Sequence, residues 1–319
     1  MALQYRVASR ADLDALAHFW NTHGGWDTLD ADGWADRFMT LPNGLETRIV
    51  VGEDGGEVVS QFLFVPTRIW ADGAEVRGLR PFAPIVAPDV RTGLNPLQHP
   101  VVAMFRHAYA EFQDMGDSVV YMIPDPRWRR LFRPLRQFQI ASFPLLSRPL
   151  PLEAPLPLDG HAAGPLDGWG PGVDALWRAS RELFGVQVVR DRETLPWKVG
   201  GGDYRLTAVE RGNALVGLAA SRHKGDRQWL VCDLLAADQD ALRATLAAAV
   251  NEGSAAAAAA EPGAIDKVSA LGAPLVEQAA LALGFERERY RFHLVVARLG
   301  ADGPDAVADP ERWTVSPND

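Results

Sequence analysis

Two short apolar runs, separated by an arginine-and-glycine turn and a helix, constrain the fold of this 319-residue chain more than any other feature. Residues 83–87 are predicted to form a strand that ends in a turn at residues 88–93, and a helix opens at Pro100. Residues 118–123 form a second predicted strand. A strand that ends in such a turn before a helix can offer backbone N–H groups and positive charge to an anion. The same order of elements returns in the second half, so the sequence predicts two copies of one α+β unit.

Composition narrows the class of protein. A chain of this length accommodates about two domains, and its net charge of −9 argues against binding to nucleic acid or to an anionic membrane. Residues 1–10 lack the apolar core of a signal peptide, and no stretch reaches the ~20 apolar residues that span a bilayer. Cys232, the single cysteine, lies in an apolar run and is expected to be an inert core thiol. We therefore expect a cytoplasmic protein, either a monomer or a homodimer.

Turn signals and hydrophobic periodicity divide the chain. A strand at residues 4–8 precedes a helix that Ser9 is expected to cap, and a hairpin turn at residues 54–56 joins strands at 48–52 and 58–69. A Pro- and Gly-rich stretch without periodicity predicts a linker at residues 149–171. We expect an N-terminal domain at residues 1–148, a C-terminal domain at residues 172–300 and a poorly ordered tail at residues 301–319.

This order of elements resembles that of the tandem GNAT acyltransferases. The resemblance is carried by Gly24-Gly25-Trp26, the meander at residues 49–69, and the segments 85–91, 121–124, 216–217, 232–235 and 283–285. It implies two GNAT-like units, each a mixed, mostly antiparallel sheet with a splayed central parallel strand pair and helices on both faces. Fem-type peptidyl transferases also pair two such units, but they use aminoacyl-tRNA, which the acidic balance of this chain disfavours.

The resemblance also implies a co-substrate, acetyl-CoA or another acyl-CoA, and no metal. Its pantetheine arm would lie between the strands at residues 83–87 and 118–123, and its pyrophosphate would rest on the turn and the start of the following helix. A backbone N–H of the first of these strands would stabilise the oxyanion. The implied cofactor-binding residues are Ile85, Val86, Ala87, Arg91, Thr92, Gly93 and Leu94.

The phosphate turn departs from the family pattern, because no second glycine follows Gly93 closely. CoA binding in the first unit and a purely structural turn therefore both remain open. In the second unit, residues 234–240 contain neither glycine nor arginine, and two aspartates there would repel a pyrophosphate. We expect the second unit to be degenerate, with a structural or acceptor-shaping role.

The acceptor side of such a site is implied to lie at the first two helices. Tryptophans with polar neighbours suit a pocket with an apolar wall and a few convergent polar groups. The substrate-binding candidates are Trp20, Asn21, Trp26 and Trp34, and the alternative for Trp20 and Trp34 is a place in the core of amphipathic helices.

An amine that attacks a thioester must lose a proton, and histidine is suited to accept it. His23 is the first candidate base, with His99 and His107 as alternatives that could instead be capping or surface residues. Asp125, like Asp89, follows a splayed strand and could orient the amine, although turn aspartates often bond to their own backbone.

The departing thiolate also needs a proton, and Tyr121 is the candidate donor. An arginine-rich helix at residues 127–136 could bind the 3′-phosphate of CoA, an acidic substrate or only solvent. The leading hypothesis is an acyl-CoA-dependent N-acyltransferase that acts on a small-molecule or sugar-like amine. The alternative is a catalytically degenerate GNAT-fold protein that binds a ligand or partner.

Overall fold

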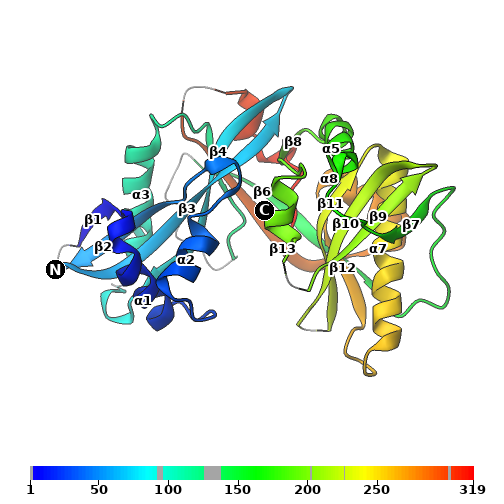
Figure 1. Cartoon of the computed structure of the whole chain (residues 1–319), viewed down its shortest axis with the longest axis horizontal. Coiled ribbons are helices and arrows are strands. Elements are labelled where there is room, and N and C mark those ends of the chain that lie inside the picture. Colours follow the sequence, from blue (N-terminus) through cyan, green and yellow to red (C-terminus); the bar gives the residue numbers. More distant parts are fainter. Residues whose placement is uncertain (1–2, 92–95, 126–137, 202, 226, 301–302) are drawn as a thin grey trace. The chain divides into compact units, whose positions relative to one another are not determined.

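The computed structural model describes residues 3–91, 96–125, 138–201, 203–225, 227–300 and 303–319. They form two compact units of strands and helices (Figure 1). The first unit comprises residues 1–69, 74–141 and 294–310, and the second comprises residues 70–73, 142–293 and 311–319. Parallel and antiparallel strands occur together with helices, which confirms the predicted α+β class.

In its described residues, the first unit contains a mixed sheet, three helices and short 3-10 turns. Its elements are β1 (Gln4–Val7), η1 (Arg10–Asp12), α1 (Leu13–His23), α2 (Ala31–Phe38), η2 (Pro42–Gly44), β2 (Arg48–Asp54), β3 (Glu57–Ala71), β4 (Ala74–Val86), η3 (Pro88–Val90), η4 (Pro96–Gln98), α3 (Pro100–Phe112), β5 (Val119–Met122) and the end of β13 (Glu286–Arg298). The pairs β1–β2, β2–β3 and β5–β13 are antiparallel, whereas β4 and β5 are parallel.

Two local signals in this unit confirm predictions from the sequence. Ser9 accepts the Ala11 N–H, and the Asp12 carboxylate accepts the Ser9 N–H at 2.7 Å, which is a capping box before α1. Gly55 and Gly56 have φ of 62° and 91° at the turn between β2 and β3. Left-handed backbone of this kind favours glycine, so the hairpin signal identified the turn correctly.

Alternation along the strands places core residues on both faces of the first sheet. On β2, Val50 packs in the α3 layer, whereas Val51 packs in the layer formed by α1 and α2. On β3, Phe62 and Phe64 belong to the α3 layer and Leu63 to the other. Successive strand side chains point to opposite faces, and each buried side chain of this size contributes about 1.5–3 kcal/mol.

The second unit repeats the arrangement of a meander followed by a long helix. Its elements are β6 (Gln139–Pro149), β7 (Ala162–Pro165), α5 (Pro171–Leu183), β8 (Val186–Val188), α6 (Thr194–Val199), β9 (Arg205–Arg211), β10 (Ala214–Lys224), β11 (Gln228–Ala236), α7 (Gln239–Ala259), β12 (Lys267–Leu271), α8 (Pro274–Ala282) and the start of β13. The strand order is β6-β12-β11-β10-β9-β7, with β11 and β12 parallel. β7 falls within the predicted linker and pairs with β9.

Strands cross between the two halves of the sequence. Residues 145–149 of β6 pair with β12 in the second unit, whereas residues 295–298 of β13 pair with β5 in the first. Each sheet is therefore completed by a strand from the other half of the sequence. None of the helices in the described ranges is both long and apolar enough to cross a membrane.

The expected poor order after Gly300 is not what the structure shows for residues 303–319. This stretch contains η6 (Asp305–Ala308) and η7 (Pro310–Arg312), and Trp313 and Val315 are buried. The Thr314 N–H donates to the Val186 carbonyl at 2.7 Å. Burial of these two apolar side chains and the backbone hydrogen bond both contribute to the order of the segment.

Candidate active site

The parallel strands β4 and β5 diverge. Within the described residues, their register covers Gly78 with Val119 and Leu79 with Val120, and both strands continue beyond these pairs. The two strands are therefore neighbours at one end and separate towards the other. The resemblance implied such a splayed pair, and its first strand, predicted at residues 83–87, is the end of the longer strand β4.

Two backbone features shape the divergence. A Cβ at Gly78 would lie 2.4 Å from Ile69 Cδ1 and 3.0 Å from Val119 Cγ1, so glycine permits the close approach where the strands pair. Further along β4, Ala83 has φ of 49°, a left-handed conformation that is costly for a residue with a side chain. Such residues are found at bulges, which bend a strand and often lie beside active sites.

One hydrogen bond sets the direction of the backbone at the end of β4. The Ala87 N–H donates to the Val59 carbonyl of β3 at 2.9 Å. Because N–H groups alternate along a strand, the Val86 N–H points to the opposite edge, away from β3. The Val86 carbonyl accepts from Arg91 Nε at 3.1 Å. A backbone donor and a guanidinium thus lie together where the strands separate.

The helix after this strand carries its own cap. Pro100 is the first residue of α3 and has no N–H, and the Val101 N–H donates to His99 Nδ1 at 3.3 Å. The pKa of His99 is lowered, mainly by burial and also by the positive charge of Arg91. The lowered pKa keeps the accepting nitrogen unprotonated. His99, an alternative base in the sequence analysis, is therefore a helix cap that occupies donors a phosphate would otherwise use.

A cavity of about 640 Å³ lies beside the end of β4. It brings His23, the first candidate base, to the same wall as Ala87 and Asp89, and the His23 ring packs 4.7 Å from Phe19 between centroids. The other residues of the wall come from β1, η1, α1 and the β2–β3 hairpin: Arg6, Asp12, Ala15, His18, Thr22, Glu53, Gly56, Glu57, Val58 and Val59.

Carboxylates dominate the charge of this cavity. Among the described residues, four carboxylates and one guanidinium, that of Arg6, border it. Arg6 is engaged by Asp12 at 2.7 Å and by Glu53 at 2.5 Å, and the Arg6 hydrogen bond lowers the pKa of Asp12 to about 2. Glu57 and Asp89 are exposed. The cavity therefore offers negative potential to a cation.

The predicted substrate-binding residues lie on another side of α1. Trp20 and Trp34 are 2% and 0% exposed and belong to the core under α1 and α2. This agrees with the alternative interpretation, in which they are core residues of amphipathic helices. Trp26 stacks on Trp20 with 4.6 Å between ring centroids and is 51% exposed. The Asn21 amide bonds to both the N–H and the carbonyl of Leu29, so it holds the loop after α1.

The remaining site predictions have different outcomes. Tyr121 is 1% exposed within β5, and Asp125 is exposed after the end of that strand. His107 lies in the body of α3. Thr92, Gly93, Leu94 and the arginine-rich segment at residues 127–136 lie outside the described residues.

Sequence reasoning missed most of the acidic wall. Asp12 is part of the cap before α1, and Glu53 and Glu57 lie on either side of the predicted hairpin turn. An inspection of charges on both sides of that turn could have suggested that they lie together. That they border the same cavity as His18 of α1 follows from tertiary packing, which spacing does not encode.

Metal binding and cysteine chemistry also bear on what this fold can do. Across the described ranges, no three His, Cys, Asp or Glu side chains gather closely enough to bind a metal ion. Cys232 is buried, and desolvation raises its pKa to about 11, as expected for an inert core thiol.

No protein-family model matches the chain, and no curated protein matches it in sequence. Among solved structures, it is similar to a GCN5-related N-acetyltransferase from Anabaena variabilis ATCC 29413, with 14% identity and a TM-score of 0.65 over 92% of this chain and 72% of that chain. A conserved protein of unknown function from Enterococcus faecalis V583, described as a probable N-acyltransferase, matches with 10% identity and a TM-score of 0.64 over 94% and 73%. A tandem GNAT protein from the clavulanic acid biosynthesis pathway matches with 16% identity and a TM-score of 0.56 over 95% and 100%. These likenesses show that the chain has the tandem GNAT fold that the sequence predicted.

Proposed function

We propose that the chain is an acyl-CoA-dependent N-acyltransferase that moves an acyl group, acetyl in the first instance, to a small-molecule amine. The observation that carries this proposal is the position of the acidic cavity at the end of β4, beside the divergence of β4 and β5. The fold shared with proteins named N-acetyltransferases supports it. The cytoplasmic location and the oligomeric state stay predictions from the sequence.

The end of β4 fits an acyl-CoA. When bound, this co-substrate supplies the acyl group as an activated thioester. The Val86 N–H, which points away from β3, would donate to the carbonyl oxygen where negative charge develops. The Arg91 guanidinium would pair with a phosphate oxygen. Ile85, Thr92, Gly93 and Leu94 remain predicted contacts.

The acidic wall favours an acceptor that carries a positive charge besides the amine that reacts. Glu57 and Asp89 are exposed carboxylates that can hold an ammonium group. Phe19 and Val58 supply an apolar wall for the carbon chain between the charges. We therefore propose a small di- or polyamine, or an amino sugar with several amines, as the acceptor class.

We assign the two proton transfers to His23, which borders the cavity at the end of β4, and to Tyr121 of β5. His23 would take the proton of the attacking amine, because it shares the cavity with Ala87 at the end of β4. Tyr121 would donate a proton to the leaving thiolate, and Asp125 would orient the amine. These two roles come from the sequence alone and rest on the position of both residues at the end of β5.

A second candidate function is ligand binding without acyl transfer. The observation that favours it is the cap on α3, since His99 and Pro100 leave few free donors for a pyrophosphate at this helix. CoA binding would then depend on Arg91 and on the turn before the helix.

Calorimetric titration with acetyl-CoA separates the two functions. We expect binding in the wild type and a loss of about 1.5–3 kcal/mol in Arg91→Ala, because a charge-assisted bond is removed. The matched control is Arg10→Ala, which removes an exposed arginine paired with Glu46 elsewhere in the first unit. Absence of binding at millimolar ligand would exclude the acyltransferase, and equal affinities in both variants would show that Arg91 does not contact the phosphates.

A further inference from the structure

The second unit has a strand divergence of its own. The parallel register of β11 and β12 covers Gln228 with Lys267, Trp229 with Val268 and Leu230 with Ser269. β11 continues to residue 236 and β12 to residue 271, so these strands also separate beyond their paired ends. The edges that face each other there carry backbone groups that need partners.

A segment from the far end of the sequence fills this divergence. The small cavity left there is bordered by Val231 and Leu234 of β11, by Leu271 of β12, and by Thr314 and Pro317. Its volume is about 20 Å³, which is room for roughly one water molecule. The cavity of the first unit is about 640 Å³. The second divergence is therefore closed by residues 313–319, which we name the 313–319 segment.

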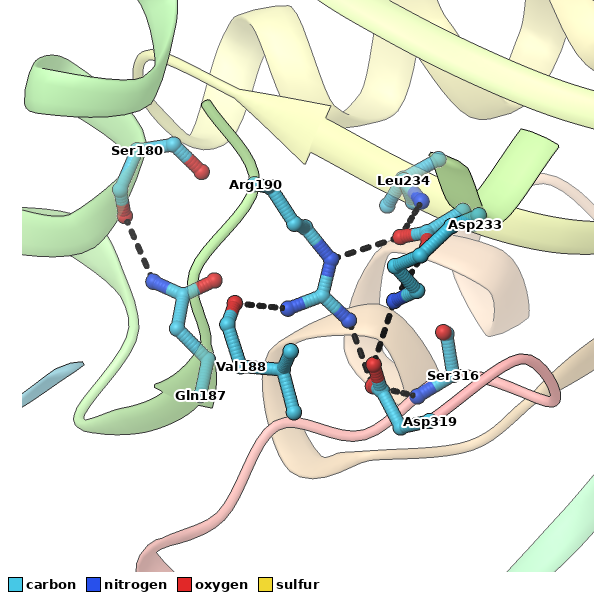
Figure 2. Close-up of polar contacts among 9 residues, drawn as sticks. Ser180, Gln187, Val188, Arg190, Asp233, Leu234, Ser316 and Asp319 are labelled. Carbon is cyan, nitrogen blue, oxygen red and sulfur yellow. Dashed lines mark hydrogen bonds and ion pairs between the residues drawn. The ribbon is translucent and has the colours of Figure 1, made fainter. Parts of the chain in front are cut away.

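Buried ion pairs fasten the 313–319 segment to the strand that diverges. Arg190 lies between two carboxylates: its Nε is 2.6 Å from Asp233 Oδ1 on β11, and its Nη2 is 2.5 Å from Asp319 Oδ2 (Figure 2). Lys198 Nζ is 2.5 Å from Asp319 Oδ1 and 2.8 Å from Asp233 Oδ2. The Ser316 N–H also donates to Asp319 Oδ2 at 2.7 Å.

The charges in this cluster balance, and water is excluded from it. The side chains of Arg190, Lys198, Asp233 and Asp319 are each at most 4% exposed. The cationic neighbours Arg190 and Lys198 lower the pKa of Asp319 despite its burial. If the 313–319 segment left, the two cations would face one carboxylate in a buried site, which is unfavourable. The segment is thus held by more than its apolar contacts.

The helix that follows β11 is closed to anions as well. The Asp238 carboxylate caps α7 by accepting the Ala241 N–H at 2.8 Å, and Asp240 lies in the first turn. Asp238 occupies an N–H donor that an anion at this helix N-terminus would need, and both carboxylates repel the anion itself. In the first unit, by contrast, the charged residue beside His99, the cap of α3, is the cationic Arg91.

We propose that the 313–319 segment is an internal plug that occupies the divergence of β11 and β12 and closes it to ligands. The chain then offers a single acyl-CoA site, in the first unit. The plug itself follows from the geometry of the second unit, and only the identity of the ligand in the first unit rests on the proposed function.

The first test measures burial of the segment. Ser316→Cys places a thiol at a buried position of the plug, and Glu311→Cys places one at an exposed position just before it. In the folded protein, we expect 5,5′-dithiobis(2-nitrobenzoate) to react about 100-fold more slowly at position 316, because reaction must await local opening. Equal rates at both positions, in variants with wild-type circular dichroism, would overturn the plug.

The second test uses the unmodified chain. Hydrogen exchange with saturating acetyl-CoA is expected to slow in residues 80–87 and to stay unchanged in residues 230–236 and 313–319. Slower exchange in residues 230–236, or two equivalents of acetyl-CoA per chain, would overturn the plug. Absence of any binding would refute the proposed function, and the thiol rates would still decide whether the plug exists.

Discussion

Substitution of Asp319 by Asn tests the charge cluster that fastens the 313–319 segment. The change keeps the shape of the side chain but removes the charge that pairs with Arg190 and Lys198. Its amide would also place an N–H₂ donor against two cations that can only donate. Because all four ionic side chains are buried, we expect the variant to lose about 3–5 kcal/mol, as for a buried pair deprived of one partner.

The assay is urea unfolding at pH 7, followed by hydrogen exchange to assign the transition. Two compact units can unfold in separate transitions, so the loss is expected in the transition that exposes β11. The matched control is Asp266→Asn, which breaks an exposed ion pair with Arg227 in the same unit. Its loss should stay below about 1 kcal/mol. Equal stabilities of Asp319→Asn and the control would refute the reasoning.

The pH dependence gives an independent check. The folded pKa of Asp319 lies below that of an unfolded aspartate because Arg190 and Lys198 favour the charged form. A group of this kind stabilises the fold above its unfolded pKa, about 4, and the stabilisation is lost as the pH falls further. The difference between wild type and Asp319→Asn should therefore shrink as the pH falls below about 4. A difference that stays constant down to the acid transition would contradict this account.

Four further predictions concern the first unit. His23→Ala should lower kcat/KM by about 10²–10⁴-fold, and a pH–rate profile identical in shape to that of the wild type would exclude His23 as the base. Glu57→Gln should raise KM for a dicationic acceptor by about 1.5–5-fold, whereas Glu46→Gln, which lies outside the cavity, should not change it. His99→Ala should cost about 1 kcal/mol of stability, and the wild type should lose stability as the pH falls below about 6.5. That loss follows because the unfolded chain takes up the proton first, and His99→Asn, which can still cap α3, should lack this pH dependence. Gly78→Ala should cost about 1–3 kcal/mol by overpacking, and unchanged thermal unfolding would show that the strands can yield there.

The features that could be predicted from the sequence are those with short-range causes. The Ser9 cap and the hairpin at Gly55 and Gly56 depend on residues within four positions of one another. The diverging strand pair of the first unit was implied by the resemblance to tandem GNAT proteins, which rests on the order of elements along the chain. Periodicity likewise left open a core position for Trp20 and Trp34, which the structure shows.

The cavity and the plug depend on contacts between distant residues. Arg6 and Glu53 are 47 positions apart, and Arg190 and Asp319 are 129 positions apart. No local pattern distinguishes these charged residues from solvated ones, since their pairing follows from how strands and helices pack. The prediction of a poorly ordered tail was wrong for the same reason. Burial of Trp313 and Val315 and the ion pairs of Asp319 order this segment, and both depend on residues that are distant in the sequence.

The different states of the two divergences follow from the residues just after each diverging strand. After β4, the chain supplies Arg91, whose guanidinium lies at the edge where the strands separate, and a cavity remains open nearby. After β11, it supplies Asp238 and Asp240, which cap and surround the start of α7. The carboxylates at the start of α7 disfavour an anionic co-substrate at that helix, whereas the strand edges and the buried Asp233 still need partners. A segment of the same chain that carries a carboxylate, held there through Arg190 and Lys198, meets both needs. The two divergences thus differ in the charge at the start of the following helix. A guanidinium lies before α3, where a cavity stays open nearby, whereas carboxylates lie at the start of α7, where the chain fills the divergence itself.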